Sequence, residues 1–200
     1  MVFARFFRRP DPTEAIAAQL YGTMVTKARD PAFYALLSVP DTVNGRFDML
    51  VIHAMLVLRR LRGGGVNADQ TGKALLELLF KDMDQSLREM GVGDMGIGRH
   101  IKRMAKALFG RAEAYEAGLD GDTAALTAIL IENLYRQTEP AADHVEQMAD
   151  YVRRAAAHVG RESAEEILAG RLDFDVPVVN IPRVNIATLD ILGAGAADGR

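Results

Sequence analysis

Apolar side chains recur every three to four residues along nearly the whole chain, and this spacing constrains the fold more than any other feature. Ile16, Leu20 and Met24 lie one helical turn apart and form one apolar stripe. The same spacing predicts helices over residues 12–28, 31–37, 47–61, 69–90, 99–117, 122–134, 139–160 (or from 138) and 163–170. No pattern typical of a buried parallel strand occurs. The sequence therefore predicts an all-α fold, a single helical domain of about seven to eight helices.

Two changes in composition divide the chain into three parts. Residues 1–11 carry three phenylalanines and three arginines and form a basic-aromatic segment. The helical pattern occupies residues 12–172, a length that can bury one core. From Asp173 onward, β-branched residues alternate with prolines and then give way to glycine and alanine. We therefore predict an extended or disordered C-terminal tail over residues 173–200.

Local signals fix several expected boundaries. Residues 38–46 are predicted to form a loop, because Pro40 and Gly45 both interrupt helices. Asp122 is expected to cap the helix that follows it. The last short helix is expected to begin with a capping box of Ser163 and Glu166.

The composition excludes several kinds of chemistry. The 200-residue chain contains no cysteine, so it has no thiolate nucleophile, iron–sulfur ligand or cysteine-bound zinc. Its histidines include no H-E-x-x-H or E-x-x-H pair, and no G-x-S-x-G elbow occurs. His53 lies within the most apolar helix, where we expect a hydrogen-bonded core histidine rather than a metal ligand. We therefore expect a protein that is not an enzyme and that needs neither metal nor cofactor.

The sequence gives no indication of export or of a membrane span. The N-terminal segment lacks the apolar stretch of a secretory signal. The longest apolar run, residues 49–58, reaches half of the roughly 20 residues that a bilayer requires. The formal net charge of −3 gives no overall attraction to nucleic acid. We expect a cytoplasmic protein that does not bind DNA and that at most lies against a membrane.

Residues 91–98 read GVGDMGIG and match the dinucleotide-binding pattern G-x-G-x-x-G. That pattern holds a pyrophosphate only between a strand and a helix, whereas the segment before it has the spacing of a long helix. We interpret the glycines as a turn between two helices. In this interpretation Gly91 ends one helix, Gly93 and Gly96 allow a tight reversal, and Asp94 caps the next helix.

Four cations share one face of the helix that follows this turn, namely Arg99, Lys102, Arg103 and Lys106; these residues are called the basic face below. No acidic residue occurs from Arg99 to Ala112. Such a run is most often a solvated helix face. The alternative is a site for an anionic partner, such as ribosomal RNA or an acidic protein. The N-terminal basic-aromatic segment also has two interpretations, a docked or frayed terminus or a contact with a membrane surface.

Several linked pieces of the sequence between Tyr21 and Phe174 resemble the ubiquinol–cytochrome c chaperone family. The pieces are FYALLSVPDTVNGRF at residues 33–47, LVLRRLR at 56–62, LLFKDMDQSLREMGVGD at 78–94, and the pattern of Lys102, Phe109-Gly110-Arg111 and Tyr115. The order of these pieces along the chain and the spacing between them together are the basis of the resemblance. The positions of this pattern that we expect to be structural are His53, Asp82, Gly91, Gly93, Phe109, Gly110 and Tyr115.

The resemblance implies an all-α, non-catalytic assembly chaperone for the ubiquinol–cytochrome c reductase (bc1) complex. In mitochondrial members the protein works with a small partner protein, associates with the ribosome and holds newly made cytochrome b. The composition and the lack of a long transit peptide indicate a bacterial member. The partner implied for this chain is cytochrome b or another bc1 subunit, with the ribosome and a small partner protein as further candidates.

We expect the partner-binding surface to combine the basic face with an apolar groove near Pro40, Asp41 and Arg46 and near the turn at residues 91–98. The alternative, from another class, is a helical protein that binds a quinone or lipid between its helices. A closed apolar cavity would favour this alternative. A solid core beside an exposed apolar groove would favour the chaperone.

Overall fold

The computed structural model describes residues 12–89, 91 and 93–174, and this part of the chain contains helices and no strands. Its helices are α1 (Pro12–Ala28), α2 (Pro31–Leu36), α3 (Val43–Leu61), α4 (Val66–Glu89), α5 (Asp94–Asp120), α6 (Thr123–Asn133), α7 (Ala142–Arg161) and α8 (Ala164–Leu168). The all-α prediction is confirmed. The basic-aromatic segment at 1–11 and residues 175–200 of the predicted tail lie outside the described residues.

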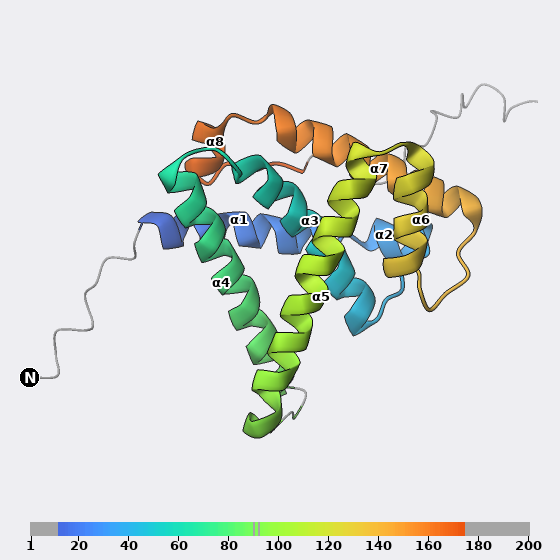
Figure 1. Cartoon of the computed structure of the whole chain (residues 1–200), viewed down its shortest axis with the longest axis horizontal. Coiled ribbons are helices and arrows are strands. Elements are labelled where there is room, and N and C mark those ends of the chain that lie inside the picture. The colour runs from blue at the N-terminus through green and yellow to red at the C-terminus, as the bar shows by residue number, and fades with distance from the viewer. Residues whose placement is uncertain (1–11, 90, 92, 175–200) are drawn as a thin grey trace, which may run out of the picture.

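Helix α3 lies in the middle of the molecule, and α1, α4, α5 and α7 pack against it (Figure 1). Residues 51–57 of α3 are all buried. A helix that is apolar nearly all round can bury every side only if other helices surround it. The buried side chains of these helices form one continuous core.

Helices α4 and α5 form a long antiparallel hairpin whose closed end projects away from the other helices (Figure 1). Gly91 ends α4 with φ of 79°, a left-handed conformation that favours glycine. The predicted role of Asp94 as cap is wrong, because Gly93 occupies the N-cap position and α5 already begins at Asp94. Gly96 therefore lies in the first turn of α5 and not in the reversal. The dinucleotide pattern joins two helices, as the sequence predicted.

The loop predicted at residues 38–46 is shorter than expected, because α3 begins at Val43. The Thr42 side chain caps this end by accepting a hydrogen bond from the Gly45 amide at 3.1 Å. Gly45 does not break the helix but allows a close approach. A Cβ atom at this position would lie 1.9 Å from the Pro40 carbonyl oxygen.

Helix α7 begins at Ala142, after the predicted start at Thr138 or Glu139. Pro140 disfavours the helical conformation in the residue before it, which delays the start. The capping residues predicted for α6 and α8 are confirmed. Asp122 accepts a hydrogen bond from the Ala125 amide at 2.8 Å, and Ser163 and Glu166 form the capping box.

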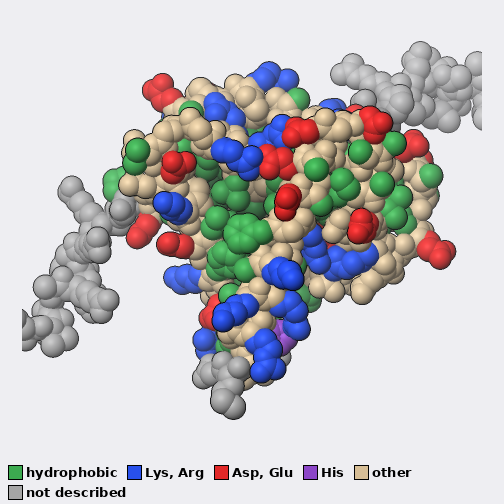
Figure 2. Space-filling model, in the orientation of Figure 1, with side chains coloured by type: hydrophobic (Ala, Val, Ile, Leu, Met, Phe, Trp, Pro, Cys, Tyr) green, Lys and Arg blue, Asp and Glu red, His purple; other side chains and the backbone are tan. Residues whose placement is uncertain are grey.

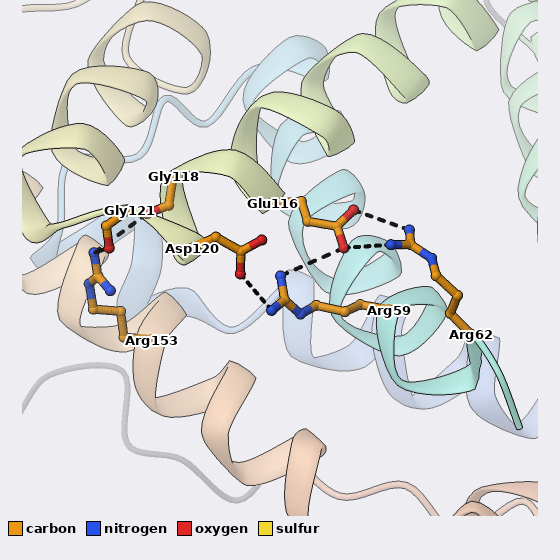
Figure 3. A network of polar contacts seen from close by, with 7 residues as sticks. All are labelled: Arg59, Arg62, Glu116, Gly118, Asp120, Gly121 and Arg153. Carbon is orange, nitrogen blue, oxygen red and sulfur yellow. Dashed lines mark hydrogen bonds and ion pairs between the residues drawn. The ribbon is translucent and has the colours of Figure 1, made fainter.

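A network of polar contacts joins the end of α3 to the second half of α5 (Figure 3). Arg59 pairs with Asp120 at 2.7 Å and with Glu116 at 3.6 Å, and Arg62 pairs with Glu116 at 2.8 Å. The Arg153 guanidinium of α7 donates to backbone carbonyls in the last turn of α5 and just after it, those of Gly118, Gly121 and Asp122. Since the paired side chains are largely at the surface, the network orients the helices more than it stabilises them.

The chain between α8 and residue 174 packs against the helices. Phe174, which the sequence assigned to the tail, is 5% exposed, and its ring contacts that of His53 at 5.1 Å between centroids. None of the described helices combines the length and the apolar composition that a membrane span requires.

Candidate partner-binding surface

A groove of about 380 Å³ opens where the end of α1, the start of α3, the second half of α4 and the first half of α5 meet. We call it the α1/α3/α4/α5 groove. Its apolar lining comes from all four helices and comprises Val25, Ala28, Val43, Phe47, Leu50, Met83, Leu87 and Met104. Val43 is 63% exposed, so the groove is open to solvent on this side. An open apolar hollow of this kind is typical of a surface that binds another molecule.

Charged side chains line the groove beside its apolar residues. Arg29 and Arg46 contribute positive charge, and Asp82 and Glu89 contribute negative charge. Tyr21 donates a hydrogen bond from its hydroxyl to the Asp82 carboxylate at 2.8 Å. The groove therefore has an apolar lining and a charged edge, which is the usual composition of a protein-binding patch.

Two residues of the predicted loop, Val43 and Arg46, line this groove, and both belong to α3 in the structure. Arg46 lines it, and its guanidinium also pairs with Asp41 at 2.6 Å and lies over the Tyr34 ring at 5.6 Å. The Arg46 guanidinium lowers the pKa of the Asp41 carboxyl. Pro40 and Asp41 are not among the lining residues. A role for Pro40, Asp41 and Arg46 in partner binding stays a prediction.

The basic face is exposed, but it does not point into the groove. Its four residues are exposed, whereas Met104 on the same helix is half-buried and lines the groove. Lys102 and Lys106 are each two positions from Met104, which places them about 160° from it around the helix. Figure 2 shows blue cationic side chains gathered at the projecting end of the hairpin. The structure therefore separates the two surfaces that we expected to be combined, and partner binding at the basic face stays a prediction.

A buried ion-pair cluster lies deeper, between α3 and α5. Asp48 of α3 is 1% exposed and pairs with Arg111 of α5 and, at 3.0 Å, with Arg136 after α6. Burial raises the pKa of Asp48 to about 6, and the positive charges of the two arginines oppose this rise. Tyr115 is fully buried, and its hydroxyl has no hydrogen-bond partner among the described residues. Burial and the nearby Asp48 charge both raise the pKa of Tyr115.

His53 is the hydrogen-bonded core histidine that the sequence predicts. It is fully buried, with Nδ1 2.7 Å from the Met49 carbonyl oxygen and Nε2 2.8 Å from the Tyr151 hydroxyl. Because a carbonyl only accepts, Nδ1 carries the proton, and the Tyr151 hydroxyl donates to Nε2. Burial lowers the pKa of His53 to about 4 and so keeps the ring neutral. Among the described residues, no group of three or more acidic or histidine side chains could hold a metal.

The remaining positions of the family pattern fall into two groups. Asp82 and Phe109 are at the surface, and the Phe109 ring rests beside Phe80 of α4 at 6.3 Å between centroids. Gly110 has open space around the position of a Cβ atom. Arg111, the next residue of α5, pairs with Asp48, and Tyr115, about one turn further along α5, lies near the same carboxylate. The family pattern therefore includes residues that hold α3 and α5 together, and its residues do not converge on one binding site.

These features define the class, an all-α protein with a buried polar cluster and an open apolar groove at its surface. The family model described as ubiquinol-cytochrome C chaperone matches residues 35–174, so the chain belongs to that family. The ubiquinol-cytochrome c reductase complex assembly factor 1 proteins of Mus musculus and Homo sapiens are both 22% identical over 152 residues. This stretch is 76% of this chain, and it covers 52% and 51% of those proteins, so the chain spans about half their length.

A solved structure gives the same result for the fold. The crystal structure of the Cbp3 homolog from Brucella abortus is 36% identical and superposes with a TM-score of 0.73. The likeness covers 82% of this chain and 92% of that one. The suspected family resemblance is confirmed.

Sequence reasoning missed three residues that hold the interior together, namely Asp48, Arg136 and Tyr151. Only Asp48 had a detectable signal, since a lone carboxylate inside an apolar helix must find a cation when it is buried. Arg136 and Tyr151 lie 88 and 98 positions from their partners in the chain. No local pattern indicates such pairs.

Proposed function

We propose that the protein is a non-catalytic assembly chaperone for the ubiquinol–cytochrome c reductase (bc1) complex and that it holds newly made cytochrome b in the α1/α3/α4/α5 groove. The family match over residues 35–174 carries this proposal, and that range contains three of the four helices that form the groove. The relatives named as assembly factors for the complex support the same function.

The chemistry of the groove suits such a client. A membrane protein that awaits assembly exposes apolar side chains to water, and an open apolar surface can cover some of them. The charged edge offers Arg29, Arg46, Asp82 and Glu89 to polar groups that flank an apolar segment. No bond in the client needs to be made or broken, so the proposal requires only binding and release.

A complementation experiment tests the proposal. We expect a deletion strain to lose the b- and c-type haem signals of the complex in its reduced-minus-oxidised spectrum, together with ubiquinol–cytochrome c activity. The wild-type gene restores them. Val43→Lys, on the groove, should restore them poorly, because a charge in the groove disfavours an apolar segment.

Val66→Lys is the matched control, since Val66 is 71% exposed at the start of α4 and is not among the groove-lining residues. It should restore the haem signals fully. Normal haem spectra and full activity in the deletion strain would refute the proposed function. Equal restoration by both variants would refute the groove as the binding surface.

The second candidate, a quinone- or lipid-binding protein, is favoured by one observation. The groove volume of about 380 Å³ lies within the range of small-molecule sites. The groove opens to solvent, however, and the core beside it is continuous. These features fit a protein segment better than an enclosed apolar ligand. Saturable binding of a ubiquinone analogue that Val43→Lys abolishes would favour the second candidate.

The ribosome, a small partner protein and a cytoplasmic position at the inner membrane are further parts of the proposal. They rest on the family resemblance alone.

A further inference from the structure

The cations of the basic face have no acidic partner among the described residues, and this distinguishes them from several other arginines of the molecule. Arg59 and Arg62 pair with Glu116, and Arg111 pairs with Asp48. In the basic face, by contrast, the contact of Arg103 is with Nδ1 of His100 at 2.6 Å. Four positive charges therefore remain uncompensated on one side of α5, in a chain whose formal net charge is −3.

The shape of the molecule makes these charges accessible to a flat surface. They lie on the part of α5 that belongs to the projecting end of the α4–α5 hairpin (Figure 1, Figure 2). Arg99 and Lys106 are seven residues apart, a rise of about 10 Å along the helix. Helices α1 and α3 meet this half of the hairpin on the side of Met104, where they line the groove, and the basic face lies on the other side of α5, so they do not obstruct an approach to it.

An exposed aromatic side chain lies on the same side of the helix. Phe109 is 52% exposed, and it is seven positions from Lys102, which places the two within about 20° of each other around α5. Cations beside a bulky apolar residue are the composition of helices that lie in a membrane interface, with the charges at the phosphates. Sites for single-stranded RNA instead interleave several aromatic residues with the cations. No aromatic residue other than His100 occurs between Arg99 and Leu108.

We propose that the basic face docks the protein on the anionic surface of a membrane while the α1/α3/α4/α5 groove stays free for its client. The two surfaces lie on different sides of α5, so both can be occupied at once. The choice of a membrane as the anionic partner rests on the proposed function, because cytochrome b has to be delivered to a bilayer. None of the described helices could cross that bilayer.

Sedimentation with lipid vesicles tests this inference without any client. The probes are vesicles of phosphatidylcholine with about a third phosphatidylglycerol, and vesicles of phosphatidylcholine alone. We expect the wild-type protein to bind the anionic vesicles and to release them as salt rises from about 0.05 to about 0.5 M. Each basic residue near an anionic surface strengthens binding about fivefold, so Lys102→Gln/Lys106→Gln should weaken it about 25-fold.

Lys73→Gln/Arg161→Gln is the matched control. It removes the same charge from exposed positions on α4 and α7, away from the basic face. We expect it to bind anionic vesicles within about twofold of the wild type, because screening confines the attraction to charges near the surface. Circular dichroism melting of both variants establishes that they fold.

Three results with vesicles alone would overturn the inference. The first is absence of binding to anionic vesicles, and the second is equal binding to phosphatidylcholine alone. The third is an equal loss of binding in the two double variants.

If a structured RNA displaces the protein from the vesicles and Lys102→Gln/Lys106→Gln loses only RNA binding, the basic face is an RNA site instead. If the wild-type protein does not bind anionic vesicles but its gene restores the haem spectra of the deletion strain, this inference fails and the proposed function stands.

Discussion

Two ionisable side chains of α3, Asp48 and His53, are buried in the same core but respond to pH in opposite directions. Burial raises the pKa of Asp48 from 3.8 to about 6, so between these values the folded state holds a proton that the unfolded state has lost. Its contribution to the free energy of unfolding therefore falls as pH rises through this window. Burial lowers the pKa of His53 from 6.5 to about 4, so there the unfolded state binds the extra proton. Its contribution rises with pH.

These two contributions are each about 3 kcal/mol and offset one another between about pH 4 and pH 6.5. Asp48→Asn removes one of them, so we expect its free energy of unfolding to rise by about 2 kcal/mol from about pH 4.5 to about pH 6.5, relative to the wild type. His53→Gln should change in the opposite direction. Urea unfolding followed by circular dichroism measures both slopes. If both variants keep the pH dependence of the wild type, the account of these two residues is wrong.

The pairing of His53 with Tyr151 gives a second prediction at this scale. Tyr151→Phe removes the hydroxyl that donates to the buried Nε2 of His53, and an unsatisfied buried acceptor costs about 1–3 kcal/mol. Tyr21→Phe removes a hydroxyl that bonds to the exposed carboxylate of Asp82, where water can replace it, and should change stability by less than about 0.5 kcal/mol. Urea unfolding near pH 7 compares the two variants. An equal effect of both would contradict the hydrogen bond described for His53.

At the scale of elements, the sequence predicted every helix, because the spacing of apolar residues is a local signal. The predicted start of α3 was wrong because a contact from outside the segment decides it. Residues 43–46 were assigned to a loop, since Gly45 normally interrupts a helix. Only the structure shows that its missing side chain makes room for the Pro40 carbonyl. The α1/α3/α4/α5 groove was expected in outline, but its lining comes from four separate helices, and no local pattern indicates that they meet.

Two glycines in helices, one in contact with a distant part of the chain and one without such a contact, test whether distant contacts decide where glycine is needed. Gly45→Ala would place a Cβ atom 1.9 Å from the Pro40 carbonyl oxygen, and we expect a loss of about 2 kcal/mol or more. Gly110→Ala meets no atom within 4 Å, so alanine should stabilise α5 by about 0.5–1 kcal/mol. Thermal unfolding measures both changes. Loss of stability in Gly110→Ala would show that this position of the family pattern has a packing role that the structure does not contain.

At the scale of the whole molecule, α5 separates two surfaces of different chemistry. Its inner side contributes Met104 to the α1/α3/α4/α5 groove, and its outer side carries the basic face. The buried cluster of Asp48, Arg111 and Arg136 joins α5 to α3 and to the chain after α6. It therefore holds both surfaces in a fixed relation to the core.

The central claim is that the α1/α3/α4/α5 groove holds newly made cytochrome b, and site-specific photo-crosslinking during translation tests it most directly. A photoreactive residue replaces Ser86, an exposed residue of the groove, or Glu146, an exposed residue of α7 outside it. We expect newly made cytochrome b to be crosslinked from position 86 and not from position 146. Equal crosslinking from both positions, or recovery of no subunit of the complex from position 86, would contradict the claim.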